Sequence, residues 1–147
     1  MSDGERAAEI AKEAHAGQVD KAGEPYINHP WRVASKLSGD EGIVALLHDV
    51  VEDSEWTLDR LRAEGFSETV LDAIDAVTRR KGEDYFDFIR RARDNEIGRV
   101  VKIHDLFDNL APERLAKLSP ADRAKAEHKY YEALSVLKIR DYQPRPL

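Results

Sequence analysis

Residues 43–53 read IVALLHDVVED, and this stretch places a histidine and three carboxylates directly after five apolar residues. The apolar positions predict a helix over residues 41–53 that is packed on several sides. Side chains four residues apart lie one above the other on a helix, so the charged residues share one strip of its surface. These residues are His48, Asp49, Glu52 and Asp53. Burying carboxylates is costly unless they are paired or bind a cation, so the stretch predicts a cation site in the core.

The rest of the chain also has the patterning of helices. Apolar residues recur at helical spacing in residues 5–16, 85–94 and 97–110. Residues that can accept hydrogen bonds from the first amides of a helix mark further helix starts, at Asn28, Thr57, Ser67 and Ser119. The helix that begins at Asn28 is expected to end near Gly39, and the last helix near Ile139. No alternating strand pattern is present, so we expect an all-α fold: a single compact bundle over residues 1–147, with a loose tail at 141–147.

Composition and charge exclude several classes of protein. A chain of 147 residues with 41% apolar composition can close one core, which favours one domain. There are 23 lysines and arginines against 29 aspartates and glutamates, so the net charge of −6 provides no attraction to nucleic acid or to an anionic membrane. The chain has no cysteine, which excludes disulfides, zinc–thiolate sites and cysteine nucleophiles. The N-terminus lacks the apolar run of a signal peptide, so we expect a cytoplasmic protein; the sequence carries no information on oligomeric state.

Two other segments offer ligands for the same cation. His29 lies in NHP at an expected helix start. Asp105 lies in VVKIHDLFDNL, where Lys102 and Asn109 share its face of the helix at spacings of three and four residues. Two histidines and two aspartates suit a divalent ion of borderline hardness, such as manganese, iron, cobalt or zinc, better than calcium or magnesium.

The order His29, His48-Asp49, Asp105 resembles the H…HD…D pattern of the HD-domain metal-dependent phosphohydrolases. Three segments narrow the resemblance to the hydrolase domain of the RelA/SpoT group, including its small stand-alone members. They are AHAGQVDKAGEPYINHP, ALLHDVVED and VKIHDLFDNL, and the resemblance covers roughly residues 5–140. Members of this group remove the 3′-pyrophosphate from guanosine tetra- and pentaphosphate. The chain has no room for the synthetase domain of longer members, so the resemblance implies an HD-domain helical bundle that hydrolyses this phosphorylated nucleotide without making it.

The resemblance assigns roles residue by residue. The residues that match the metal ligands are His29, His48, Asp49 and Asp105, which implies one divalent ion. We expect manganese, with iron, cobalt or zinc as alternatives. Glu52 and Asp53 match the acidic pair that handles the attacking water, a task for carboxylates within hydrogen-bond reach. A divalent ion in this site would lower the pKa of bound water and polarise a phosphoryl oxygen.

The substrate contacts follow in the same way, with one departure from the family. Lys21 and Asn109 match nucleotide contacts, and Tyr130 falls where the family has a tyrosine near the ligand. Asp20 stands where the family has an arginine that lies over the guanine base, and an aspartate cannot stack on a purine. This departure predicts weak binding of guanosine tetraphosphate, or a substrate with another base.

Several alternatives remain open. Lys102 shares a helix face with Asp105, so it either meets a phosphate or pairs with a carboxylate. The Glu52-Asp53 pair could be a solvated helix end, and Asn109 could serve only as a helix cap. The chain could also be a phosphohydrolase for a different nucleotide or phosphate ester, or a non-catalytic module that binds a nucleotide and keeps the metal as a structural pin. An intact Glu52-Asp53 pair favours catalysis over the non-catalytic module.

Overall fold

The computed structural model describes residues 2–142, with side chains up to Lys138. Helices α1 to α10 follow one another in this part of the chain, and no strand occurs in it, which confirms the all-α prediction. Their bounds are α1 Asp3–Ala14, α2 Asn28–Ala34, α3 Gly39–Leu47, α4 Val50–Asp53, α5 Leu58–Ala63, α6 Glu68–Ala76, α7 Tyr85–Arg93, α8 Glu96–Asn109, α9 Pro112–Leu115 and α10 Pro120–Tyr142. None of the helices within residues 2–142 has the length and apolar character that crossing a membrane requires.

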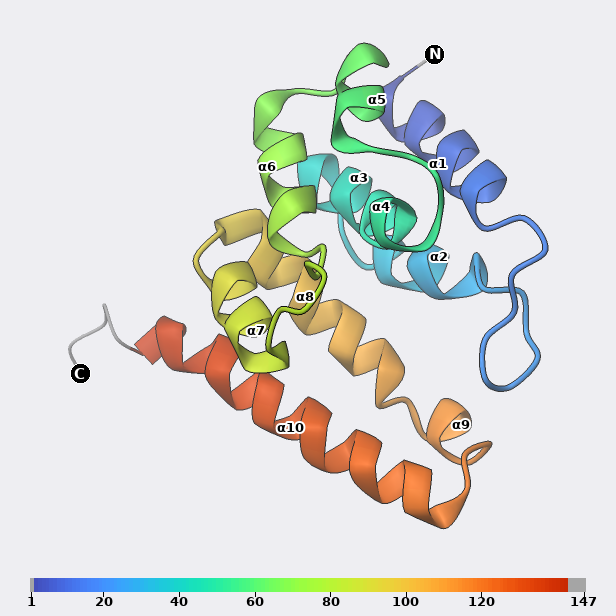
Figure 1. Cartoon of the computed structure of the whole chain (residues 1–147), viewed down its shortest axis with the longest axis vertical. Coiled ribbons are helices and arrows are strands. Elements are labelled where there is room, and N and C mark those ends of the chain that lie inside the picture. Colours follow the sequence, from blue (N-terminus) through green and yellow to red (C-terminus); the bar gives the residue numbers. More distant parts are fainter. Residues whose placement is uncertain (1, 143–147) are drawn as a thin grey trace.

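Helix α3 lies inside the bundle (Figure 1). It packs against α1, α2, α6 and α8, while α10 runs along the outside and packs against α7 and α8. The apolar side chains of α3 meet these neighbours, and Val44, Ala45 and Leu47 are completely buried. A helix that is apolar almost all round needs several helices to cover it. The expectation that this stretch packs on several sides is therefore confirmed.

The helix expected over residues 41–53 is not continuous. Helix α3 ends before His48 and α4 begins after Asp49, so these two residues form a turn between two helices. The His48 Nδ1–H group donates to the Ala45 carbonyl at 2.6 Å, and an unbroken helix would use this same carbonyl for the Asp49 amide. The side-chain bond competes with the helical one and helps to end α3. The expectation of one continuous helix over residues 41–53 is therefore wrong, and His48 and Asp49 lie in the turn between α3 and α4.

Three of the four expected helix caps are confirmed. The Thr57 and Ser67 hydroxyls accept from backbone amides in the first turns of α5 and α6, and Ser119 does the same before α10. Asn28 is not a cap but the first residue of α2. Its amide donates to the Pro25 carbonyl, so a backbone turn already leads into the helix and no side-chain cap is required.

Two helix ends differ from the sequence-based expectation. Helix α2 ends at Ala34 and not near Gly39, because the amides of Lys36 and Leu37 bond only three residues back, to the carbonyls of Val33 and Ala34, and so close a tight turn. Helix α10 continues to Tyr142, past the expected end near Ile139. The expected loose tail therefore starts too early, and its residues 143–147 lie outside the described part of the chain.

Candidate metal centre

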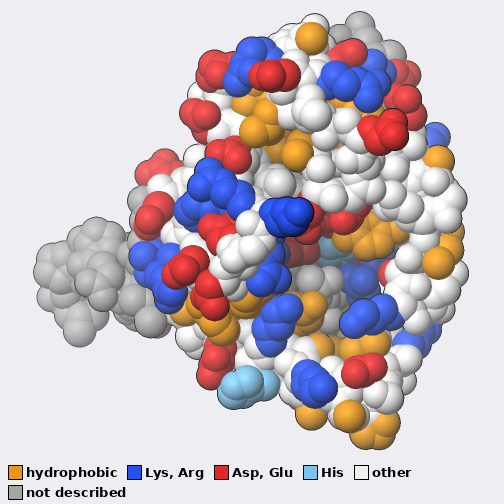
Figure 2. Space-filling view, in the orientation of Figure 1, with side chains coloured by type: hydrophobic (Ala, Val, Ile, Leu, Met, Phe, Trp, Pro, Cys, Tyr) orange, Lys and Arg blue, Asp and Glu red, His pale blue; other side chains and the backbone are white. Residues whose placement is uncertain are grey.

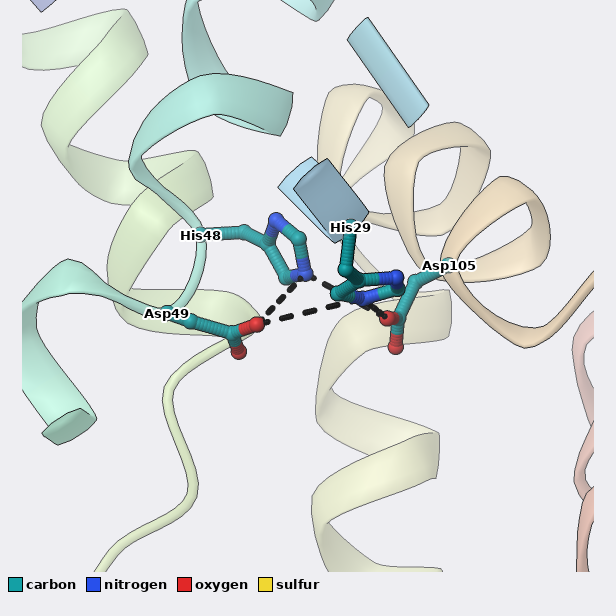
Figure 3. A group of neighbouring side chains, drawn as sticks. All are labelled: His29, His48, Asp49 and Asp105. Carbon is teal, nitrogen blue, oxygen red and sulfur yellow. Dashed lines mark hydrogen bonds and ion pairs between the residues drawn. The ribbon is translucent and has the colours of Figure 1, made fainter. Parts of the chain in front are cut away.

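Four side chains from three parts of the bundle converge on one point (Figure 3). His29 comes from the first turn of α2, Asp105 from α8, and His48 and Asp49 from the turn between α3 and α4. The His29 Nε2 atom lies 2.7 Å from Asp105 Oδ1 and 3.9 Å from Asp49 Oδ2. The His48 Nε2 atom lies 3.3 Å from Asp105 Oδ1 and 3.1 Å from Asp49 Oδ2. One donor atom from each residue lies within 4.8 Å of the others, so the group can hold a single metal ion.

Both imidazole rings are oriented by a bond on the side away from the cluster. The His48 Nδ1 atom lies 2.6 Å from the Ala45 carbonyl oxygen, which can only accept a hydrogen bond. The His29 Nδ1 atom lies 2.6 Å from Asp108 Oδ2, which is also an acceptor. For His29 the acceptor at 2.6 Å is closer than the Arg114 Nη1 donor at 3.0 Å from the same atom, so we assign a proton to each Nδ1, and each Nε2 faces the cluster. An outer partner that holds the ring in this way is typical of metal-ligating histidines, so the donor set fits a metal ion.

The two candidate carboxylate ligands are held in place as well. The Tyr26 hydroxyl donates to Asp49 Oδ2 at 2.6 Å. The Lys102 ammonium group donates to Asp105 Oδ2 at 2.7 Å, which leaves Asp105 Oδ1 between the two imidazoles. All four candidate ligands thus have a second contact that fixes their direction, and this reduces the freedom that is lost when an ion binds.

The buried charges of the cluster compensate one another. Burial lowers the pKa of His48, but the carboxylates of Asp49 and Asp105 outweigh burial and raise that pKa well above its ordinary value. Burial raises the pKa of Asp105, but Lys102 and the two histidines outweigh burial and hold that pKa well below its ordinary value. The carboxylates are therefore ionised at neutral pH. Protons on the imidazoles and a divalent cation are alternative ways to compensate these carboxylates, so an ion that binds at this site would displace protons.

The two acids expected to act on water lie on α4, next to the cluster but outside its donor set. The Glu52 Oε1 atom accepts a hydrogen bond from the Arg79 backbone amide at 2.7 Å. The Gln18 side-chain amide donates to the Asp53 carbonyl at 2.9 Å and ties the end of α4 to the loop after α1. Partial burial and the nearby Asp49 and Glu52 carboxylates raise the pKa of Asp53 to about 6. A carboxyl group with such a pKa can exchange a proton with water near neutral pH.

A cleft of about 360 Å³ lies beside the cluster, between α10 and the loop that precedes α2. Three of the four residues expected to contact substrate line it: Lys21, Asn109 and Tyr130. Tyr26 lines the same cleft and contacts Asp49, so this tyrosine connects the cleft to the candidate ligands. Figure 2 shows a hollow on this face of the molecule, with acidic side chains and a histidine deep inside and Lys and Arg side chains around it. Such a charge distribution suits an anionic ligand that reaches a bound cation.

The fourth residue expected to contact substrate, Lys102, points elsewhere. Its ammonium group contacts Asp105, and its side chain is only 12% exposed. This contact supports the alternative of carboxylate pairing. Asp20 does line the cleft, but its Oδ1 atom accepts from the backbone amides of Ala22 and Glu24. Asp20 therefore also holds the loop in shape.

Sequence reasoning missed four residues that support the cluster. Asp108 is buried and contacts His29, and Arg32 and Arg114 both donate to its carboxylate. Asp108 follows Asp105 by three residues, so helical spacing could have placed both on one face of α8. The fourth is Tyr26, which lies 23 residues from Asp49 in a loop without periodicity. No sequence pattern marks it.

Comparison with known proteins identifies relatives for this site. The family model of the HD domain matches residues 7–103, which include His29, His48 and Asp49. A protein of Aquifex aeolicus named guanosine-3′,5′-bis(diphosphate) 3′-pyrophosphohydrolase is 35% identical over 119 residues, which are 72% of this chain and 17% of that protein. A probable GTP pyrophosphokinase of Mycobacterium leprae is 34% identical over 152 residues, covering 92% of this chain and 19% of that protein. The chain therefore spans less than a fifth of the length of each of these relatives.

The fold is also that of a solved structure. A metazoan ortholog of SpoT, described as hydrolysing ppGpp, superposes with a TM-score of 0.75 at 21% sequence identity, over 94% of this chain and 86% of that one. Its likeness covers more of the chain than the family match, which ends at residue 103. The chain therefore belongs to the HD-domain family, as the family match shows and as the order and convergence of its histidines and aspartates support.

Proposed function

We propose that this protein is a metal-dependent pyrophosphohydrolase that removes the 3′-pyrophosphate of guanosine tetra- or pentaphosphate. The observation that carries the proposal is the donor set of His29, His48, Asp49 and Asp105, in which both Nε2 atoms face the carboxylates. The relatives named as 3′-pyrophosphohydrolases support the substrate class. The cleft with Lys21 at its wall supports an anionic ligand.

The four residues of the donor set would hold one divalent ion, and manganese is the ion we prefer over iron, cobalt or zinc. Such an ion supplies a water of lowered pKa and polarises a phosphoryl oxygen. The partners Tyr26, Lys102 and Asp108 would keep the donors in place as the substrate arrives.

The residues around the donor set would then act on water and substrate. Asp53, with a pKa raised to about 6, is suited to take a proton from the attacking water, and Glu52 is held by the Arg79 amide so that it can orient that water. The water oxygen bonds to the phosphorus next to the 3′ oxygen as the bond between that phosphorus and the 3′ oxygen breaks. The 3′ oxygen takes up a proton and becomes a hydroxyl, so the products are pyrophosphate and guanosine 5′-diphosphate or 5′-triphosphate. Lys21, Asn109 and Tyr130 would contact the nucleotide in the cleft.

One observation favours a second candidate, a phosphohydrolase for a nucleotide with another base. Asp20 lines the cleft and is fixed there by the Ala22 and Glu24 amides. A fixed carboxylate offers a purine no stacking surface, although it can accept hydrogen bonds from a base. The substrate test must therefore include bases other than guanine.

A substrate panel tests the proposal. Purified protein loaded with manganese is incubated with guanosine tetraphosphate, its adenosine counterpart, a nucleoside 3′-monophosphate and a nucleoside 5′-triphosphate, and released phosphate and pyrophosphate are measured separately. We expect pyrophosphate from a 3′-diphosphate and loss of that activity in Asp49→Ala. Release of single phosphates, or no release from either 3′-diphosphate, would contradict the proposed function.

A further inference from the structure

Two cations lie against one aromatic ring close to the candidate metal centre. The Lys129 Nζ atom of α10 lies 4.2 Å from the centre of the Tyr85 ring at the start of α7, and the Arg79 Cζ atom lies 5.6 Å from the same centre. Lys129 also lies 5.8 Å from the ring centre of Tyr130, which lines the cleft. Among the described side chains, neither cation forms an ion pair with a carboxylate. Two positive charges therefore lie close together here, and no described carboxylate pairs with either of them.

Arg79 is fixed although its charge is not neutralised. Its Nε and Nη2 atoms donate to the Glu83 carbonyl at 3.0 and 2.9 Å, which holds the guanidinium group in one position. Its backbone amide donates to Glu52, one of the two acids next to the donor set. The cation pair therefore borders the place where water would be activated.

The Tyr85 hydroxyl adds a second observation. Its oxygen is buried and has no hydrogen-bond partner in the described part of the chain. Leaving a buried hydroxyl unpaired costs free energy, and a bound ligand can recover that cost. Lys102, which contacts Asp105, is near enough to Tyr85 to affect its ionisation, so this hydroxyl lies toward the donor set.

The charged groups that affect the pKa of Lys129 are all positive. Partial burial and the positive charges of Arg79, Lys102 and Lys21 lower the pKa of Lys129 below its ordinary value. Like charges repel one another, so an arrangement of this kind is costly until an anion arrives. A phosphate group, with several acceptor oxygens and negative charge, would relieve both the repulsion and the unpaired hydroxyl.

We propose that Lys129, Arg79 and the Tyr85 hydroxyl form a subsite for the outer phosphate of a diphosphate whose inner phosphate lies at the metal centre. The inference rests on the proposed function in that this diphosphate is the pyrophosphate removed from the nucleotide. It adds a reason for selectivity. A single phosphate contacts only the metal centre, while a diphosphate also contacts Lys129 and Arg79. Lys129 is then a substrate-binding residue that discriminates diphosphates from monophosphates.

Calorimetric titration of the metal-loaded protein with inorganic pyrophosphate and, separately, with inorganic phosphate tests the subsite. We expect Lys129→Met to weaken pyrophosphate binding about tenfold, the effect of one charge-assisted hydrogen bond, and to leave phosphate binding within about twofold. Lys129→Arg keeps the charge and should restore pyrophosphate binding. Lys125→Met, an exposed lysine one turn earlier on α10, is the matched control and should bind both anions as the wild type does.

A second variant keeps the test decisive if Lys129→Met fails to fold. Tyr85→Phe removes only the unpaired hydroxyl and should weaken pyrophosphate binding several-fold while leaving the fold intact. Equal pyrophosphate affinity in Lys129→Met and Lys125→Met would overturn the subsite, as would an equal loss for phosphate and pyrophosphate. If the titrations show the expected difference but no nucleotide 3′-diphosphate is hydrolysed, the subsite stands and the proposed function fails.

Discussion

The candidate metal centre and the cation pair on Tyr85 are neighbours, but the protein fixes their charges in opposite ways. In the centre, all four donor residues have a second partner, so burial, hydrogen bonds and opposite charges balance within the protein. In the second region, Lys129 and Arg79 contact the ring of Tyr85, and Arg79 also contacts a carbonyl, but neither contacts a carboxylate among the described side chains. The first region is therefore organised before any nucleotide binds, whereas in our proposal the second region is completed by the ligand. Changes in the first region should abolish activity, and changes in the second should alter substrate choice.

The largest loss of activity is expected from changes to the acids of α4, where the two regions meet. Replacing Glu52 by Gln and Asp53 by Asn together should lower the turnover number on the order of 10² to 10⁴-fold, because both groups that can accept the proton of water are lost. Metal content should stay at the wild-type level, since neither residue belongs to the donor set. Glu55→Gln, an exposed acid just after α4, is the control and should turn over normally. Wild-type turnover in the double variant would refute these roles.

Removal of the ion should destabilise the protein, because the donors come from three separate helical segments. A ligand present at about 100 times its dissociation constant stabilises the native state by about 2.7 kcal/mol. For a chain of this length that corresponds to a fall in melting temperature of roughly 5–10 °C on addition of a chelator. Thermal unfolding followed by circular dichroism measures it, with the Asp49→Ala variant as the control that should not respond to chelator. Identical responses in the two proteins would show that the stabilising ion binds elsewhere.

The hydrogen-bond partners on the outer side of the donor set should affect metal affinity, and Asp108 tests this. Asp108→Asn removes the charge that holds the His29 ring, and loss of such a partner costs about 10- to 100-fold in metal affinity or activity. Competition with a fluorescent metal chelator measures the affinity. Asp72→Asn, an exposed position on α6, is the matched control. Equal metal affinity in both variants would mean that His29 needs no outer partner.

The smallest effect is expected in the cleft, at the position where this chain departs from the family. Asp20→Arg supplies a stacking group worth about 1–2 kcal/mol, so the Michaelis constant for guanosine tetraphosphate should fall roughly 5- to 30-fold with little change in the turnover number. Asp20 also accepts two loop amides, so Asp20→Asn, which keeps an acceptor oxygen, separates base recognition from loop stability. Tight binding of guanosine tetraphosphate by the wild type would show that Asp20 does not weaken base recognition.

The sequence predicted the helical fold and the convergence of the four candidate ligands, for a physical reason. Charged residues inside strongly apolar segments must be compensated, and this requirement marks His48, Asp49 and Asp105 without knowledge of the fold. The turn that separates α3 from α4 was missed because it depends on one side-chain bond from His48 to Ala45, which competes with the helix only in the folded protein.

Other contacts between distant segments could not be predicted from the sequence. Tyr26 meets Asp49 from a loop, and Lys129 of α10 meets Tyr85 of α7 only because these two helices pack together. Neither contact has a local pattern, since helical spacing describes neighbours on one helix and not partners across the bundle. Tyr26 at the candidate metal centre and Lys129 in the proposed subsite therefore became visible only in three dimensions.

The central claim is that His29, His48, Asp49 and Asp105 hold one divalent ion, and metal analysis tests it most directly. Wild-type protein and Asp49→Ala are purified in parallel, exposed to manganese, dialysed and analysed for all divalent metals by plasma mass spectrometry. We expect about one ion per wild-type chain, and a large loss of metal from Asp49→Ala because removing a donor leaves the site incomplete. Equal metal content in the two proteins, or none in either, would contradict it.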